Sequence, residues 1–144
     1  MMDPSIPRIP LQTTQGCLLG TLPRELVPGT LFQFELDLLE KVSHCRLLGV
    51  VIDLSAVELM DLTEFRKLRR IIDMTAMLGP RAVAVGWRPG VVAGLIALGA
   101  DATGLATALN VELGLDTLLG RQTATNPDTA ALPDVLRQAL AGAG

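Results

Sequence analysis

The pattern of apolar and polar residues along the chain predicts strands that alternate with helices. The clearest strand is Leu47–Leu54, an almost unbroken apolar run of the kind found in strands that are covered on both faces. The clearest helix comes next and ends at Leu78, just before a Gly-Pro pair that stops it. Its apolar residues Phe65, Leu68 and Ile72 recur at helical spacing, with charged residues between them. These two elements form the centre of the predicted fold.

Shorter signals of the same kind give the remaining elements. A Gln-Gly pair indicates a turn between two strands near the start, and proline or glycine residues bound the later runs. The expected elements are two strands within Ile6–Leu22, a helix over Leu31–His44, a helix opened by Asp61 or Thr63, a strand over Ala82–Gly86, a helix over Pro89–Leu98, a strand over Gly104–Ala108 and a helix over Val111–Leu119. This order, β-β-α-β-α-β-α-β-α, predicts an α/β fold with a mixed, mostly parallel sheet of about five strands and four or five helices.

The stretch Leu31–His44 can be read in two ways. Phe32 and Phe34 alternate with other residues as in a strand, whereas the leucines further along follow a helical period. We favour a helix, with Thr30 as its candidate cap, because the run is long and poor in β-branched residues. In a helix Phe32 and Phe34 cannot both point inward, so one of them is expected on the surface, where a contact in an oligomer would cover it.

Residues 1–119 are expected to form one domain, in keeping with a length of 144 residues. From 120 to 144 the sequence is polar and rich in turn formers at first, which predicts a linker, and Leu132–Leu140 is a candidate for a short amphipathic helix. The start of the chain lacks the apolar region of a signal peptide, so none is expected. The longest charge-free apolar stretch, Pro89–Ala100, is too short to span a membrane.

Composition and charge narrow the possible functions. Hydrophobic residues make up 49% of the chain and charged residues 19%, which indicates a globular protein. The net charge of −3 and the scarcity of aromatic residues argue against nucleic-acid binding. Cys17 and Cys45 have neither a disulfide-framework nor a metal-site spacing, so reduced thiols in the cytoplasm are expected. No nucleophile–base motif surrounds the single histidine, His44, and we expect neither enzyme activity nor a cofactor nor a metal.

The most distinctive chemistry lies in Gly49–Phe65, which joins the central strand to the helix after it. The loop carries Ser55, whose side chain is expected to support the turn, and Asp53 is expected to stabilise the same loop. Asp61 and the glutamate three residues later have the spacing of an aspartate-containing capping box, with Thr63 on the first helical turn. A hydroxyl in that position is exposed, and the positive end of the helix dipole favours a phosphate on it.

In this segment the chain resembles the STAS family of anti-sigma factor antagonists. The family hallmark is a strand, a turn like Asp53-Leu-Ser55, an apolar pair, an aspartate and a helix start that carries a phosphorylatable hydroxyl. The resemblance covers roughly Ile6 to Leu118 in order. Within the family, the chain is similar in particular to the single-domain RsbS-type scaffolds of stressosomes. Its other pieces are Ile9-Pro10-Leu11, Cys17-Leu18-Leu19, Asp37-Leu38-Leu39, Leu78-Gly79, Gly86-Trp87-Arg88-Pro89, Leu98-Gly99 and the run from Thr107 to Leu115.

The resemblance implies a non-enzymatic regulatory binding module of the cytoplasm. Such a module sequesters a serine/threonine switch kinase, co-assembles with paralogous STAS-domain subunits as a homo- or hetero-oligomer, and is regulated by phosphorylation at the loop–helix junction. The alternative within the family is a direct anti-anti-sigma factor, which binds an anti-sigma factor kinase. Neither reading involves nucleic acid or a membrane.

The resemblance also marks Thr63 and Ser55 as phosphorylation candidates. In RsbS-type proteins the phosphorylated serine directly follows the aspartate, and here Leu62 takes that place. Thr63 falls where antagonists of the SpoIIAA type carry their second hydroxyl. Two alternatives stay open: Thr63 is the acceptor, or this subunit has lost the switch and acts only as a scaffold.

The residues expected to bind the partner flank the same junction. They are Asp61, Leu62, Thr63, Glu64, Arg66 and Lys67. Leu62 is expected to be an exposed apolar contact. The basic run that includes Arg66 and Lys67 is either a solvated helix face or a patch that fits an acidic partner or a neighbouring subunit.

Overall fold

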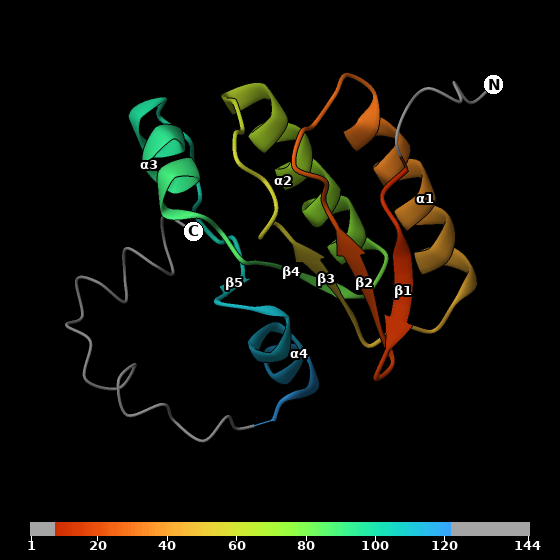
Figure 1. Ribbon diagram of the computed structural model, residues 1–144. Coiled ribbons are helices and arrows are strands. Elements are labelled where there is room, and N and C mark those ends of the chain that lie inside the picture. Colours follow the sequence, from red (N-terminus) through yellow and green to blue (C-terminus); the bar gives the residue numbers. More distant parts are fainter. Residues whose placement is uncertain (1–7, 122–144) are drawn as a thin grey trace.

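The computed structural model describes residues 8–121. Within this range five strands and four helices follow one another in the predicted order (Figure 1). The strands are β1 (Leu11–Thr14), β2 (Cys17–Thr21), β3 (Gly49–Asp53), β4 (Arg81–Val85) and β5 (Thr107–Ala108). The helices are α1 (Thr30–His44), α2 (Leu62–Met77), α3 (Pro89–Ala97) and α4 (Val111–Leu119).

The strands form a single sheet in the order β1-β2-β3-β4-β5. The first two are an antiparallel hairpin, and the other three pairs are parallel. Thr21 is the partner of Asp53, and Asp53 is the partner of Val85, so β2, β3 and β4 end at the same level. Their carboxyl ends therefore lie along one edge of the sheet, and each continues through a loop into a helix.

The central strand β3 is covered on both faces, as its apolar sequence predicted. Val50 and Ile52 belong to a large cluster that also contains residues of α1, α2 and α3, whereas Val51 belongs to a smaller cluster with α4. Figure 1 shows α1 and α2 behind the sheet and α4 in front of it. The close approach of α4 depends on Gly114, because a Cβ at that position would lie 2.8 Å from Val85 Cγ1. The mixed, mostly parallel α/β fold is confirmed.

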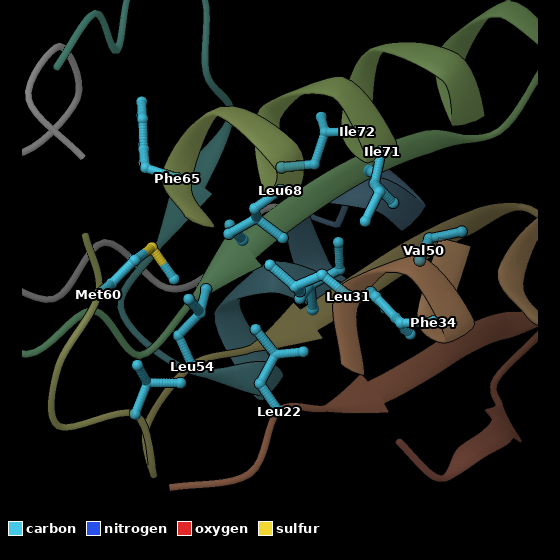
Figure 2. Packing of buried hydrophobic residues seen from close by; sticks show 14 of the residues in the cluster. Leu22, Leu31, Phe34, Val50, Leu54, Met60, Phe65, Leu68, Ile71 and Ile72 are labelled. Atoms are coloured by element: carbon cyan, nitrogen blue, oxygen red, sulfur yellow. The ribbon is translucent and has the colours of Figure 1, made fainter. Parts of the chain in front are cut away.

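The larger cluster is where the apolar stripes of α1 and α2 pack against the sheet. Figure 2 shows Leu31 and Phe34 of α1 beside the strands, and Leu68 and Ile71 of α2 above them. All four side chains are buried. Burial of each such side chain contributes roughly 1.5–3 kcal/mol relative to its exposure, so this layer fixes α2 and the loop that leads into it.

The segment after Pro28 is a helix, as favoured from the sequence, but it begins differently. Phe34 is 1% exposed and Phe32 is 63% exposed, which confirms that only one of the two points inward. Thr30 is not the cap. Gly29 holds the cap position with a left-handed φ of 91°, and Thr30 is the first helical residue, buried in the core. Glycine adopts this φ without strain, and the turn that it makes places Thr30 inside.

The described elements end with α4, which is followed by the left-handed Gly120. Asn110 caps this helix as predicted, since its side chain accepts a hydrogen bond from the amide of Leu113. The expected linker and the candidate helix Leu132–Leu140 lie outside the described residues. None of the helices in residues 8–121 has the length and apolar character that crossing a membrane requires.

Candidate functional site

Three loops lie together at the carboxyl edge of the parallel strands. They span residues 22–29, 54–61 and 86–88, and they lead into α1, α2 and α3 respectively. Backbone hydrogen bonds continue the sheet into them. The amide of Leu22 donates to the carbonyl of Asp53 at 2.9 Å, and the amide of Leu54 donates to that of Val85 at 2.8 Å. The three helices therefore start from one continuous surface.

The middle loop, residues 54–61, is anchored in the core at every third residue. Leu54, Val57 and Met60 are buried, and Figure 2 shows Leu54 and Met60 among the side chains of the larger cluster. The residues between them point outward, and Leu59 is 80% exposed. An anchored backbone loses little conformational freedom when a partner binds its outward side chains, which favours a docking role for this loop.

α2 begins with a complete capping box, as predicted. The carboxylate of Asp61 accepts a hydrogen bond from the amide of Glu64 at 2.7 Å, and the carboxylate of Glu64 accepts one from the amide of Asp61 at 2.9 Å. Thr63 is exposed between them at the second helical position, and its hydroxyl forms no hydrogen bond with another residue in the range 8–121. The helix end is thus satisfied without the threonine side chain.

Glu58 links the middle loop to the loops on either side. Its carboxylate lies 2.8 Å from Nε of Arg24 and 3.9 Å from Nη1 of Arg88. Arg88 also donates from Nε to the carbonyl oxygen of Ser55 at 2.8 Å. Because these side chains are well exposed, solvent screens the ion pairs and each adds little stability, but together with the hydrogen bond from Arg88 they connect the three loops.

Asp53 stabilises the first turn of the middle loop, as expected. Its carboxylate accepts a hydrogen bond from the amide of Ser55 at 2.9 Å. The structure differs from expectation for Ser55 itself, whose backbone amide and carbonyl hold the turn in place of its hydroxyl. Gly86 passes so close that a Cβ there would lie 2.9 Å from a carboxylate oxygen of Asp53, and its φ is 75°. The contact between the two loops therefore requires glycine at this position.

Leu62 is half-buried, so the prediction that it is exposed is wrong. It lines a hollow beside the first turns of α2, and Gly99 lines the same hollow from the end of α3. Arg69 holds the segment after α3 against α2 by donating to the carbonyl oxygen of Asp101 at 3.0 Å and to that of Thr103. Helical periodicity within α2 cannot reveal this hollow, because the segment on its other side lies far along the chain.

The other expected partner-binding residues do surround the junction. Asp61, Thr63, Arg66 and Lys67 are exposed, and Glu64 is partly exposed. Leu59, the prominent apolar side chain of this surface, was not among the residues predicted from the sequence. A signal for it was available, because Leu59 falls outside the every-third spacing of the buried loop residues.

Burial shifts the pKa of one titratable group near the sheet, and hydrogen bonds shift that of another. Burial raises the pKa of the Cys17 thiol above its ordinary value, and Arg121 opposes that shift. Hydrogen bonds from Thr103 hold the pKa of Asp101 below its ordinary value. Residues 8–121 contain no group of three or more His, Cys, Asp or Glu side chains arranged to hold a metal ion.

The carboxyl edge therefore presents three features to a partner: the free hydroxyl of Thr63, the apolar side chain of Leu59 and charges of both signs.

Comparison with solved structures gives similar proteins over most of the chain. A Ser→Glu variant of RsbS from Moorella thermoacetica is 33% identical, with a TM-score of 0.68, and the match covers 79% of this chain and 98% of that one. A chain from the stressosome, described as a signal integration and transduction hub, is also 33% identical with a TM-score of 0.68, over 78% of this chain and 100% of that one.

A third similar structure is the anti-sigma factor antagonist SpoIIAA in its unphosphorylated form. It is 14% identical with a TM-score of 0.62, and the match covers 80% of this chain and 99% of that one, so the likeness concerns the fold alone. No protein-family model matches the chain, and the search of curated proteins gives no match. The matches to RsbS and to the stressosome chain extend over nearly the whole length of those proteins, and so include the carboxyl edge.

Proposed function

Because the chain belongs to the STAS family of anti-sigma factor antagonists and is related to RsbS, we propose that it is a stressosome scaffold and antagonist in the cytoplasm. It sequesters a serine/threonine switch kinase and releases that kinase when the loop–helix junction is phosphorylated. It assembles with paralogous STAS-domain subunits in a homo- or hetero-oligomer, and it contributes binding, not catalysis. The likeness to a chain of the stressosome supports the assembly part of this proposal.

The observation that carries the proposal is the free hydroxyl of Thr63 on an anchored, exposed helix start. The capping box satisfies the backbone without it, so a kinase can modify the hydroxyl and leave the helix start intact. Ser55 is the second candidate acceptor and is exposed as well. Thr63 is the better one, because it stands on the first turn of a long helix, whose dipole favours an added phosphate.

A phosphate on Thr63 changes the surface that a partner meets. It adds about −1.5 to −2 units of charge at neutral pH, next to the carboxylates of Asp61 and Glu64. A partner that docks on Leu59 and approaches these acidic groups then faces stronger repulsion and a larger desolvation cost. Arg66 and Lys67, on the following turn, offer contacts to acidic groups of the partner. The unmodified surface therefore binds and the modified one releases.

The test is calorimetric titration of the full chain with a GHKL-type serine/threonine kinase from the same genome. We expect the wild type and Thr63→Val to bind, because valine keeps the size of the side chain. We expect Thr63→Glu to weaken binding about 100-fold, or roughly 2.8 kcal/mol. Leu59→Ala should weaken binding about tenfold, since it removes the central apolar contact.

The matched control is Thr13→Glu, which places the same charge on an exposed threonine of β1, away from the junction. It should bind like the wild type. The proposal fails if the chain binds neither the kinase nor a paralogous STAS subunit, or if Thr13→Glu and Thr63→Glu have equal effects.

A direct anti-anti-sigma factor is the second candidate function. The position of Thr63 favours it, because that residue falls at the second hydroxyl of SpoIIAA-type antagonists. The two functions differ in what binds. In this second case an anti-sigma factor alone forms a stoichiometric complex that Thr63→Asp abolishes, and paralogous STAS subunits do not co-purify with the chain.

A further inference from the structure

The early turns of α2 carry four basic side chains, and two of them have partners within the part of the chain that the structure describes. Arg69 donates to two carbonyl oxygens of the segment after α3, and Arg70 lies 3.6 Å from the carboxylate of Glu35. Arg66 and Lys67 are exposed, and neither forms a hydrogen bond or an ion pair with another described residue. Their positive charges are therefore free to act on another group.

These two free cations stand three and four residues after Thr63 in the same helix. Residues at these spacings are neighbours on a helix surface, with about 5–6 Å between their Cβ atoms. The Cα–Cβ bonds of a helix tilt toward its N-terminus, so Arg66 and Lys67 extend from their turn toward that of Thr63. All three side chains are exposed. A group attached to the threonine oxygen lies within reach of both cations.

The carboxylates around the two free cations already accept hydrogen bonds. Asp61 accepts one from the amide of Glu64, and Glu64 accepts one from the amide of Asp61. Asp101 lines the hollow that Arg66 also lines, and its carboxylate accepts a hydrogen bond from the amide of Thr103. A phosphate carries about −1.5 to −2 charges and three acceptor oxygens, so it is a stronger partner for these cations than the carboxylates are.

We propose that Arg66 and Lys67 bind the phosphate of phosphorylated Thr63 within the same chain, and we call this arrangement the phosphate clamp. The inference rests on the proposed function, since it requires a phosphate on Thr63. Transfer of the γ-phosphoryl group of ATP to Oγ1 of Thr63 forms one O–P bond, breaks the bond to ADP and releases the hydroxyl proton. The phosphate then takes both cations away from the acidic groups of the kinase, so release includes the loss of two contacts.

The spacing fits a phosphate at position 63 better than one at position 62. Three and four residues after position 62 stand Phe65, which is buried, and Arg66. A phosphate on residue 62 would therefore have one cation at helical spacing, whereas a phosphate on Thr63 has two. In this chain the hydroxyl stands one place after Leu62, and the pair of free cations matches that place.

A ³¹P NMR titration of the full chain, with phosphothreonine inserted at position 63 during translation, tests the clamp without any kinase. Cations that bind the phosphate favour its dianion and so lower the pKa of its second proton. We expect the acid dissociation constant of that proton to be about threefold smaller in the double variant Arg66→Gln/Lys67→Gln than in the wild type. The difference should shrink as salt is added, because the groups are exposed.

The matched control is Lys41→Gln/Arg46→Gln, which removes the same two side-chain types from exposed positions at the far end of α1 and just after it. It changes the net charge equally and should titrate like the wild type. Arg66→Lys/Lys67→Arg keeps both charges and should retain most of the effect. All three variants should melt close to the temperature of the wild type, because the replaced side chains are exposed.

Kinase binding measures the consequence of the clamp. We expect phosphorylation of Thr63 to weaken binding about 100-fold in the wild type and about tenfold in Arg66→Gln/Lys67→Gln, because that variant has no cations to withdraw. Repulsion by the phosphate alone predicts the opposite. In that case the loss is equal or larger in the variant, whose phosphate is not neutralised.

Two results overturn the inference. One is an equal dissociation constant of the phosphate in the wild type and in Arg66→Gln/Lys67→Gln, and the other is a loss of kinase binding on phosphorylation that is no smaller in that variant. A clamp detected by NMR in a chain that binds no kinase contradicts the proposed function alone. Release of the kinase by a phosphate that titrates alike in both chains contradicts the inference alone.

Discussion

The starts of α1 and α2 place the same residue type in opposite environments. Each helix follows a parallel strand at the same edge of the sheet, and each has a threonine in its first turn. Thr30 is 1% exposed, and its hydroxyl is buried without a hydrogen-bond partner within the described residues. Thr63 is exposed, and the helix start is capped by Asp61 and Glu64. A threonine at a helix start is therefore a candidate switch only when other groups cap the helix and the threonine is not buried in the core.

The largest expected effect comes from placing a carboxylate at each threonine. Thr30→Glu should lower the free energy of unfolding by at least about 3 kcal/mol, because it buries a charge with no partner. Thr63→Glu should stay within about 0.5 kcal/mol of the wild type, because it lies on the surface and a negative charge near a helix start is favourable. Urea denaturation of both variants measures the difference. Similar losses in the two would refute the contrast between the two helix starts.

The capping box gives the next largest effect. Asp61→Ala should lower the free energy of unfolding by about 1 kcal/mol, since the amide of Glu64 loses its acceptor. Asp61→Asn keeps a side-chain oxygen at the cap and should cost only a few tenths of a kcal/mol, which makes it the matched control. Urea denaturation compares the two with the wild type. If alanine costs no more than asparagine, the cap does not carry the helix start.

A smaller effect of opposite sign is expected at Thr30. Thr30→Val removes a buried hydroxyl that has no partner within residues 8–121 and keeps the side-chain shape, so it should raise the free energy of unfolding by up to about 1 kcal/mol. Thr63→Val should leave it unchanged, because water solvates that hydroxyl. Thermal unfolding of the two variants side by side detects the difference. A loss of stability in Thr30→Val would show that its hydroxyl does have a stabilising contact.

The two cysteines also differ in burial, and we expect this difference to change stability less than the substitutions above. Cys17 is buried and Cys45 is exposed, and burial raises the pKa of Cys17. The unfolded chain therefore loses the Cys17 proton at lower pH than the folded chain does. The resulting stability is present below the unfolded pKa and is lost as the pH rises through the folded one.

Two measurements check this alkaline effect. An alkylating reagent at neutral pH should modify Cys45 quickly and Cys17 only on unfolding. The fall in melting temperature between neutral and alkaline pH should be smaller in Cys17→Ala than in Cys45→Ala. Equal alkylation rates for the two thiols would mean that Cys17 is accessible in the folded protein.

Local patterns in the sequence predicted the fold and part of the candidate site correctly. The apolar run of β3 predicted a strand that is covered on both sides, and the spacing of Asp61 and Glu64 predicted the capping box. These features depend on residues close together in the chain. The exposed hydroxyl of Thr63 follows from the same local geometry, so it could also be predicted from the sequence.

The remaining features depend on contacts between distant segments. Gly99 and Asp101 bound the hollow that Leu62 lines, and Arg69 bonds to the carbonyl oxygen of Asp101, an arrangement that no pattern within α2 indicates. Thr30 is buried because Gly29 takes a left-handed conformation that turns the helix start inward. The loop contacts of Glu58 likewise need three loops to be placed before any of the charges can be paired.

In the proposed function, phosphorylation of Thr63 is the event that releases the kinase. The most direct test is phosphopeptide mass spectrometry of the full chain after incubation with the kinase and ATP, together with the bound fraction in the same sample. We predict one major site, Thr63, with release of the kinase in step with its modification and with neither event in Thr63→Val. Phosphate on Ser55 or another residue with release intact in Thr63→Val, or binding that persists after Thr63 is fully phosphorylated, would contradict the claim.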